Sequence, residues 1–241
     1  MADPDDSTNG LAANPAEGET ATGRGSLDRR RIIEAAVTLI DQYGLRQLTM
    51  RRLGSLLGVE GMALYHYIPG RENLLDGIVE TIIDELIEDP ELMLIGRDWR
   101  GYLRRLALAV RRTAFAHPEV FPLIATRPST MPWTRPPLRS LRWTETFLRT
   151  MKDCGLSEEA AIAIYRGFCS FLLGQLLFDL AGRPAEPAAA GADSMPQHIV
   201  PDAREYPLLA GLDPDSMLAS AAEFEQEIEW LLHRLAATVV D

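Results

Sequence analysis

Apolar residues recur every three or four positions through most of the chain, which is the spacing of amphipathic helices. The first run starts at Leu27, with Ser26 as a candidate N-cap and Gly44 as a stop signal. A second short helix follows Thr49 and ends at Gly58, and a third follows at once and ends before Pro69. Three short helices joined by a tight glycine-containing turn fit a helix-turn-helix.

The pattern beyond this unit is also helical. The span from Arg71 to Glu88 is apolar over a broad face and is broken by Asp89-Pro90. Further helices are predicted at about 99–117, 119–125, 136–154, 157–181 and 214–240, and no strand pattern or internal repeat is evident. We therefore expect an all-α fold with a three-helix head at 26–70 and a helical body at 71–241 that begins with a connecting helix.

Two segments lack helical periodicity. Residues 1–25 are acidic and rich in small residues, so we expect a disordered tail. Residues 182–213 carry five prolines among small residues, which predicts a long loop. That loop is interpreted either as a lid over a pocket or as a tolerated insertion.

The charge is distributed unevenly. A net charge of −11 and a pI of about 4.9 argue against a nucleic-acid partner, because phosphates favour basic surfaces. Residues 1–23 carry five acids and no base, whereas 24–71 carry eight arginines against four acids. The net charge is therefore −5 for residues 1–23, +4 for 24–71 and −10 for 72–241. A basic head adjoins an acidic body.

Composition and motif searches exclude several functions. No stretch approaches the roughly 20 apolar residues of a membrane span, and the start of the chain lacks a signal-peptide pattern, so we expect a cytoplasmic protein with no membrane partner. Cys154 and Cys169 stand alone, without metal-ligand spacing, so we expect no metal. No zinc-protease motif, nucleophile elbow or phosphate loop is present, so we expect no enzyme and no cofactor.

Specific residues in the head resemble those of a known family. The segments Leu48-Thr49-Met50-Arg51-Arg52-Leu53, Gly58-Val59, Leu64-Tyr65-His66-Tyr67 and Arg71-Glu72-Asn73-Leu74-Leu75 closely resemble the TetR family of bacterial repressors. The resemblance is strong from about Leu27 to Leu86 and extends further only in helical layout. It implies a DNA-binding head and a ligand-binding and dimerisation body.

The resemblance implies a homodimeric repressor that binds a pseudo-palindromic operator in double-stranded DNA and is released by a small, largely apolar or aromatic effector. The same DNA contacts would serve an activator or a ligand-dependent co-repressor. A helical protein-interaction module without DNA binding is the alternative from a different class.

The resemblance also assigns DNA contacts. Arg51 should reach a base edge, since a guanidinium pairs with guanine O6 and N7, and Tyr65 should bond a phosphate. Thr49 and Arg71 lie at helix starts, where donors meet phosphate oxygens. The remaining expected contacts are at the recognition helix: Gly61, Met62, Ala63, His66 and Tyr67.

The start of the recognition helix departs from the family pattern. Gly61 has no side chain to offer, and Met62 and Ala63 can make only apolar contacts, so the operator sequence is not indicated. Tyr67 either packs in the small core with Leu64 or touches the DNA backbone.

Aromatic residues concentrate in the body, where pockets for small organic ligands are mostly apolar with a few polar groups. His117, Arg127 and Gln175 are the candidate polar groups, although Arg127 is equally suited to pair with an acid and His117 to end a helix. The candidate pocket residues are Trp99, His117, Phe121, Arg127, Trp133, Trp143, Phe147, Phe171 and Gln175.

Two helices near the C-terminus resemble the pair that forms the four-helix dimer interface in TetR proteins. Apolar residues of the last helix recur at alternating spacings of four and three, a seam suited to helix pairing. An intramolecular helical hairpin is the alternative. The candidate interface residues are Leu173, Leu176, Leu180, Met217, Ala221, Phe224, Ile228 and Leu231.

Overall fold

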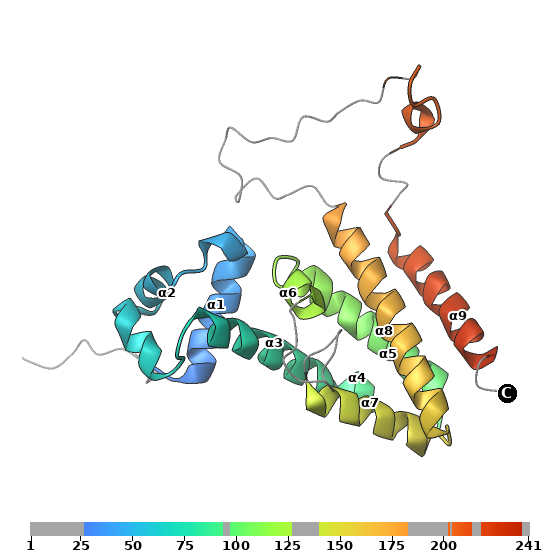
Figure 1. The fold of residues 1–241 in the computed structure, drawn as a ribbon, viewed down its shortest axis with the longest axis horizontal. Helices are drawn as coiled ribbons and strands as arrows, with labels where there is room; N and C mark the ends of the chain where they lie inside the picture. Colours follow the sequence, from blue (N-terminus) through green and yellow to red (C-terminus); the bar gives the residue numbers. More distant parts are fainter. Residues whose placement is uncertain are drawn as a thin grey trace, which may run out of the picture.

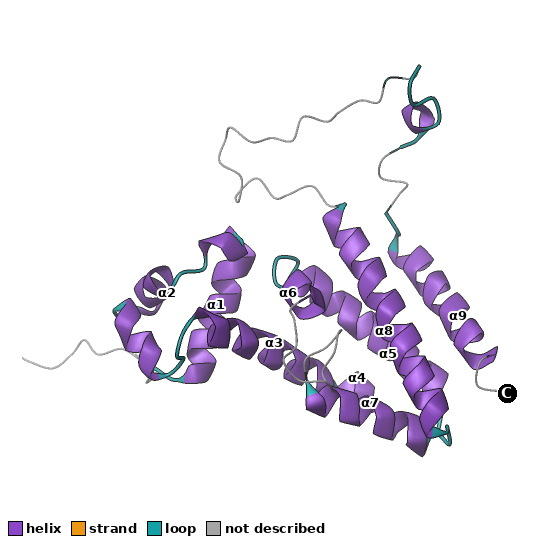
Figure 2. Cartoon of the chain, in the orientation of Figure 1, coloured by secondary structure: helices purple, strands orange, loops and turns teal. Residues whose placement is uncertain are grey.

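A computed structural model describes residues 27–93, 97–126, 140–182, 202, 204–213 and 218–237. These residues form helices joined by turns and loops, with no strand among them, which confirms the expected all-α class (Figure 2). The expected tail at 1–25 and most of the expected loop at 182–213 lie outside the described residues.

The head is built from four short elements. Helix α1 (Arg29–Tyr43) is followed by a 3-10 turn, η1 (Leu45–Gln47), by α2 (Met50–Leu57) and by a 3-10 segment, η2 (Gly61–His66). Asp28, not Ser26, caps α1, because its carboxylate accepts a hydrogen bond from the Arg31 N–H at 2.8 Å. Ser26 itself lies outside the described residues.

The predicted limits of α2 are confirmed. Thr49 caps its start, where the hydroxyl accepts a hydrogen bond from the Arg52 N–H at 3.2 Å. Gly58 ends it in the left-handed conformation, with φ of 72°, which a residue with a Cβ rarely adopts. The turn between α2 and η2 therefore depends on this glycine.

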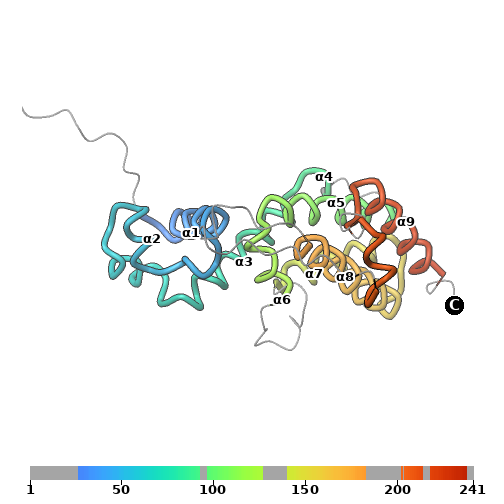
Figure 3. Tube along the Cα trace, turned by 90° about the horizontal axis from the view of Figure 1, so that it is seen from above, coloured from blue at the N-terminus to red at the C-terminus, as the bar shows by residue number. Residues whose placement is uncertain are grey.

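Helix α3 (Arg71–Ile87) connects the head to the body (Figure 1). In its first half Leu74, Leu75 and Ile78 are buried, and α3 packs there against α1. In its second half Ile83 and Leu86 are buried, and α3 also packs against α5, α6 and α7. Viewed from above, α3 runs from the head at one end of the molecule into the body (Figure 3).

The body contains the remaining helices. They are α4 (Pro90–Met93), α5 (Trp99–Ala116), α6 (Phe121–Thr126), α7 (Leu141–Asp153), α8 (Glu158–Ala181), the 3-10 turn η4 (Leu209–Gly211) and α9 (Ala221–Ala237). Helix α9 lies along α8 and packs against both α5 and α8 (Figure 1). The body is thus a bundle with α8 near its centre.

The last helix starts later than expected. We predicted a start near residue 214, but α9 begins at Ala221. The Ser220 hydroxyl accepts a hydrogen bond from the Glu223 N–H at 3.2 Å, and the Glu223 carboxylate accepts one from the Ser220 N–H at 2.8 Å. This reciprocal capping box fixes the start of α9.

Helix α8 is long and apolar enough to cross a membrane by length and composition, although polar residues such as Arg166 and Gln175 interrupt its apolar sequence. Its buried face includes Ile164, Phe168 and Leu176, and it packs against α5, α6, α7 and α9. Within the described residues, α8 is therefore the central helix of the bundle.

Most of the predicted dimer-interface side chains are already covered within one chain. Leu173, Leu176, Phe224, Ile228 and Leu231 are each at most 7% exposed. The seam on α9 pairs this helix with α5 and α8 of the same chain, as the intramolecular alternative proposed. Among the other candidates, Leu180 is half-buried and Ala221 is exposed, whereas Met217 lies outside the described residues.

The packing of the head predicts a contrast between two leucines. Leu64 is fully buried under η2, whereas Leu56 on α2 is 55% exposed. We expect Leu64→Ala to lower the free energy of unfolding by about 2–5 kcal/mol, because the truncation leaves a cavity. Leu56→Ala should change it by less than about 0.5 kcal/mol. Denaturant titrations at one protein concentration measure both, and equal losses would contradict the described packing.

Candidate functional site

The segment η2 presents one exposed face. Leu64 is fully buried and anchors the segment, as expected. Met62 is 73% exposed, Tyr65 is 45% exposed, Tyr67 is 44% exposed, and His66 is also exposed. Tyr67 therefore does not pack in the core, which removes one of its two interpretations. Two phenols, an imidazole and a thioether are available for contact on this surface.

A pair of glycines sets the position of η2 on α2. A Cβ on Gly54 would lie 2.8 Å from the Gly61 nitrogen and 2.8 Å from the Val59 carbonyl oxygen. Both are backbone atoms, so no side-chain rotation relieves the overlap. Sequence reasoning missed Gly54, because a glycine within a helix signals a close backbone approach only once its neighbour is known.

Gly61 contributes to the same close approach. A Cβ on Gly61 would lie 3.0 Å from the Met50 carbonyl oxygen and 3.1 Å from the Arg51 Cα. Its side-chain direction therefore faces the first turn of α2. This position packs η2 on α2, so Gly61 stays a predicted DNA contact through its backbone alone. Ala63, which is half-buried, stays a predicted contact.

Two adjacent arginines at the start of α2 differ in their environment. The Arg52 guanidinium donates to Gln47 Oε1 at 2.7 Å and lies 4.4 Å from the centroid of the Tyr43 ring. Arg51 is exposed and, like Arg46 in η1, forms no ion pair within the described part of the chain. The head thus holds Arg52 in place and leaves Arg51 and Arg46 available to an external anion.

The two predicted phosphate contacts at helix starts already have partners. The Thr49 hydroxyl oxygen caps α2, which leaves its hydrogen free to be donated outward. The Arg71 guanidinium is exposed and makes a long hydrogen bond of 3.5 Å to the Leu45 carbonyl oxygen. Both remain predicted contacts.

A polar contact joins the head to the end of α5. His117 Nδ1 lies 2.7 Å from Asp41 Oδ2, so the last turns of α1 are tied to the turn that precedes α6. Burial raises the pKa of the Asp41 carboxyl, and the hydrogen bond from His117 opposes this shift. The second oxygen of this carboxylate is buried without a hydrogen-bond partner.

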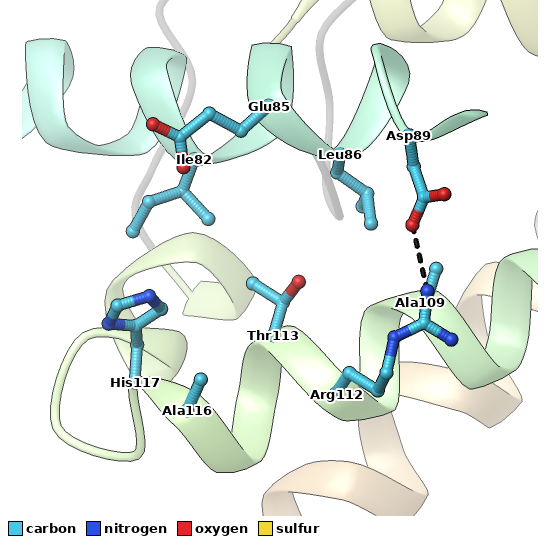
Figure 4. Close-up of a pocket in the computed structure, with 9 residues that line it drawn as sticks. All are labelled: Ile82, Glu85, Leu86, Asp89, Ala109, Arg112, Thr113, Ala116 and His117. Carbon is cyan, nitrogen blue, oxygen red and sulfur yellow. Dashed lines mark hydrogen bonds and ion pairs between the residues drawn. The ribbon is translucent and has the colours of Figure 1, made fainter. Parts of the chain in front are cut away.

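The same histidine lines a cavity of about 220 Å³ between α3 and α5. Figure 4 shows Glu85 and Asp89 above the cavity and Arg112, Thr113 and His117 below it. Arg112 Nη2 donates to Asp89 Oδ2 at 2.8 Å and closes one end. His117 is therefore both a wall of this cavity and the hydrogen-bond partner of α1.

Three of the candidate pocket residues are core residues. Phe121, Trp143 and Phe147 are at most 3% exposed. The Phe147 ring packs edge to face against Tyr165, with 5.1 Å between centroids, and burial raises the pKa of Tyr165 to about 12. The Trp143 indole N–H is buried and has no hydrogen-bond partner, which is costly unless a ligand or water accepts it.

The other candidates do not converge on one cavity. Trp99 is half-buried beside the guanidinium of Arg100. Gln175 donates to Asp179 at 3.2 Å, and Phe171 lines a separate groove between α8 and α9. Arg127 and Trp133 lie outside the described residues. Among the described residues, the expected single aromatic pocket is therefore divided among the core, the cavity at His117 and this groove.

Two family models match the chain. Residues 32–78 match the model described as bacterial regulatory proteins of the tetR family. Residues 94–239, more than half of the chain, match the model of the tetracyclin repressor-like C-terminal domain. The first match covers the head and half of α3, and the second covers the body from before α5.

Individual proteins are similar along most of the chain. A helix-turn-helix transcriptional regulator of Saccharopolyspora erythraea is 25% identical over 88% of this chain and 86% of its own length. A crystal structure of a possible TetR family regulator from Streptomyces coelicolor has a TM-score of 0.65 at 26% identity, covering 88% of this chain and all of that one. ActR of Streptomyces coelicolor, solved in complex with actinorhodin, has a TM-score of 0.63 at 24% identity, covering 90% of this chain and all of that one.

The glycine contact predicts a sharp effect of one added methyl group. Gly54→Ala should displace η2 from α2 at a cost of about 1–3 kcal/mol, because the new Cβ overlaps backbone. Binding of a DNA fragment from the gene's upstream region should weaken more than about tenfold in fluorescence anisotropy. Ser55→Ala, at the next and exposed position, is the control. Unchanged binding by the Gly54 variant would show that the contact does not position the interface.

Proposed function

The chain belongs to the TetR family of bacterial regulatory proteins, and on that premise we propose which of its parts bind DNA, receive the effector and link the two. It is a homodimeric, DNA-binding repressor of transcription that responds to a small molecule. We assign DNA binding to residues 26–70 and effector binding and dimerisation to 71–241. We further propose that the protein acts by binding rather than by catalysis, and that it resides in the cytoplasm as a soluble protein.

The observation that carries the DNA assignment is the exposed face of η2. Met62, Tyr65, His66 and Tyr67 project from η2, and Arg51, at the start of the adjacent α2, has no ion pair in the part of the chain that the structure describes. A segment of this size fits the major groove when it is held across a turn from a supporting helix. The guanidinium of Arg51 supplies the bidentate donor for a guanine.

The roles of the other contacts follow from their chemistry. The Tyr65 and Thr49 hydroxyls and the Arg71 guanidinium donate to phosphates and orient the head. Met62 and Ala63 offer apolar contact to a thymine methyl group. Because so few polar side chains reach the bases, we infer that sequence-dependent DNA shape contributes to operator choice.

We propose that the effector is an apolar or aromatic molecule with a hydrogen-bond acceptor. The aromatic side chains of α5, α7 and α8 supply apolar walls, and the unpartnered Trp143 N–H supplies a donor. The ActR complex with actinorhodin provides a precedent for ligand binding on this fold. Actinorhodin is therefore the first probe to test.

We propose that the contact between His117 and Asp41 transmits effector binding to the head. An effector changes operator affinity only by favouring a conformation that binds DNA poorly. A shift of the end of α5 moves His117, and the 2.7 Å hydrogen bond then pulls or releases α1. Because α1 packs on α2 and α3, this changes the position of η2 on the DNA.

The DNA assignment predicts a loss of discrimination in one variant. Arg51→Ala should lower affinity for the cognate fragment about 5–150-fold, since a bidentate base contact contributes about 1–3 kcal/mol. Affinity for unrelated DNA should change much less. Arg104→Ala, which removes a cation from the body, is the charge-matched control. Anisotropy titrations measure each affinity. Equal losses of affinity for cognate and unrelated DNA would show that Arg51 contacts a phosphate and not a base.

Two further variants separate effector binding from transmission. Trp143→Phe keeps the apolar ring but removes the donor, so affinity for actinorhodin should fall about 2–10-fold, with Trp99→Phe as the control.

Asp41→Ala should leave the affinity for actinorhodin unchanged but reduce the release of DNA by the bound effector. Calorimetry and anisotropy measure the two steps. Full release by the Asp41 variant would contradict the proposed route.

A further inference from the structure

The junction of α5, α8 and α9 holds polar atoms without partners. Five buried side-chain atoms in the described residues lack a hydrogen-bond partner, and three of them are Arg111 Nε, Asp179 Oδ2 and Glu227 Oε2. Asp179 is only 3% exposed. Because buried polar groups are almost always paired, the two carboxyl oxygens indicate a place for a further hydrogen-bond donor.

The three residues form one electrostatic cluster. Asp179 interacts with Arg111 from α5 and with Glu227 from α9, and its carboxylate accepts hydrogen bonds from Gln175 and from the Ala219 N–H. The Arg111 guanidinium lies 4.5 Å from the centroid of the Phe115 ring. The cluster therefore sets one guanidinium against two carboxyl groups.

The cluster opens onto the outer surface through a groove of about 400 Å³ between α8 and α9. Phe171, Trp230 and the acids Glu223 and Glu227 line the groove together with Gln226, and no base is among these residues. An acidic groove with aromatic walls fits a cationic group.

The surface beside the groove has the properties of a helix-pairing face. Along α8, Arg166, Ser170, Gly174 and Phe178 are exposed at intervals of four residues, and Phe178 is 53% exposed. Nothing lies within 4 Å of the position that a Cβ on Gly174 would occupy. Small residues at the middle of such a row allow a second helix to approach closely, and an exposed apolar patch marks a binding surface.

Two-fold symmetry brings a particular base to the groove. In a C2 dimer the same patch faces itself. If two copies of α8 run antiparallel and cross at Ser170–Gly174, a residue before the crossing on one helix lies opposite a residue beyond it on the other. Arg166 is exposed and has no ion pair among the described residues. The crossing carries it toward the partner's Phe178, at the level of the first turns of α9.

We propose that Arg166 of each subunit enters the α8/α9 groove of the other and pairs with Glu227, which neutralises the buried cluster. This inference rests on the homodimer and specifies the interaction that completes it. The dimer face is then the exposed row on α8 and the groove, in place of the buried seam on α9.

The pairing makes dimerisation sensitive to acid. Burial raises the pKa of Asp179 and of Glu227, and the mutual repulsion of these carboxyls, together with Glu223, raises that of Glu227 further. Arg111, Gln175 and the Ala219 N–H oppose the shift at Asp179. A cation from the partner lowers these pKa values, so dissociation takes up protons and the dimer weakens as pH falls.

Sedimentation equilibrium without DNA tests the pairing by charge exchange. Arg166→Glu and Glu227→Arg should each raise the dimer dissociation constant at least about tenfold, because each places like charges together. The double variant should restore most of the wild-type affinity. Lys152→Glu on α7 is the control. If either single variant loses helicity in circular dichroism, the double-mutant cycle is repeated without charge reversal. It then compares Arg166→Gln, Glu227→Gln and the combination of the two.

The pairing would be overturned by single variants that dimerise like wild type. It would also be overturned by a double variant whose dissociation constant rises by the product of the two single effects. Both results would leave the repressor assignment intact. Dimerisation of the wild type that is independent of pH would overturn the pairing as well. A wild-type chain that is monomeric at every concentration would remove the homodimer on which the inference rests.

Discussion

Helix α3 must belong to two packing units at once, and this constraint governs the rest of the molecule. Its first half completes the small core of the head through Leu74 and Ile78, and its second half is buried in the body through Ile83 and Leu86. Buried apolar contact at both ends makes the helix costly to detach from either unit. The head therefore follows any displacement of the body, which is what a repressor needs in order to release DNA.

The head and the body differ in the sign of the charge that they leave available to a partner. The head holds the Arg52 guanidinium against Gln47 and Tyr43 and leaves Arg51 without an ion pair among the described residues, so that a basic surface meets the phosphates despite the acidic composition of the chain. The body brings the guanidinium of Arg111 together with the carboxyls of Asp179 and Glu227, and one atom of each is buried without a hydrogen-bond partner. The first arrangement suits DNA, and the second suits a cation supplied by another subunit.

The sequence predicted the helices with long amphipathic patterns well, because periodicity reports a buried face directly. It also placed Thr49 and Gly58 correctly, since caps are local interactions. Periodicity does not say which helix covers a face, and for that reason the seam at Phe224 and Ile228 was assigned to a partner subunit instead of to α5 and α8.

The candidate site was predictable only in part for the same reason. The exposed residues of η2 follow from a family resemblance and from one buried anchor, Leu64. The contact between Gly54 and Gly61 crosses the turn between α2 and η2, and the bond between Asp41 and His117 joins residues 76 positions apart, so helical periodicity reveals neither of them. The capping box of Ser220 and Glu223 joins residues only three positions apart, and it, rather than the apolar periodicity from about residue 214, sets the start of α9.

Selection of DNA from a random duplex pool by the purified wild-type chain tests the central claim most directly. A dimer that presents two copies of η2 must recover an inverted repeat whose half-sites lie about one helical turn apart, in a complex that weakens steeply with salt. Recovery of a single half-site, or no enrichment over the starting pool, would contradict a dimeric repressor that reads operator DNA through this head.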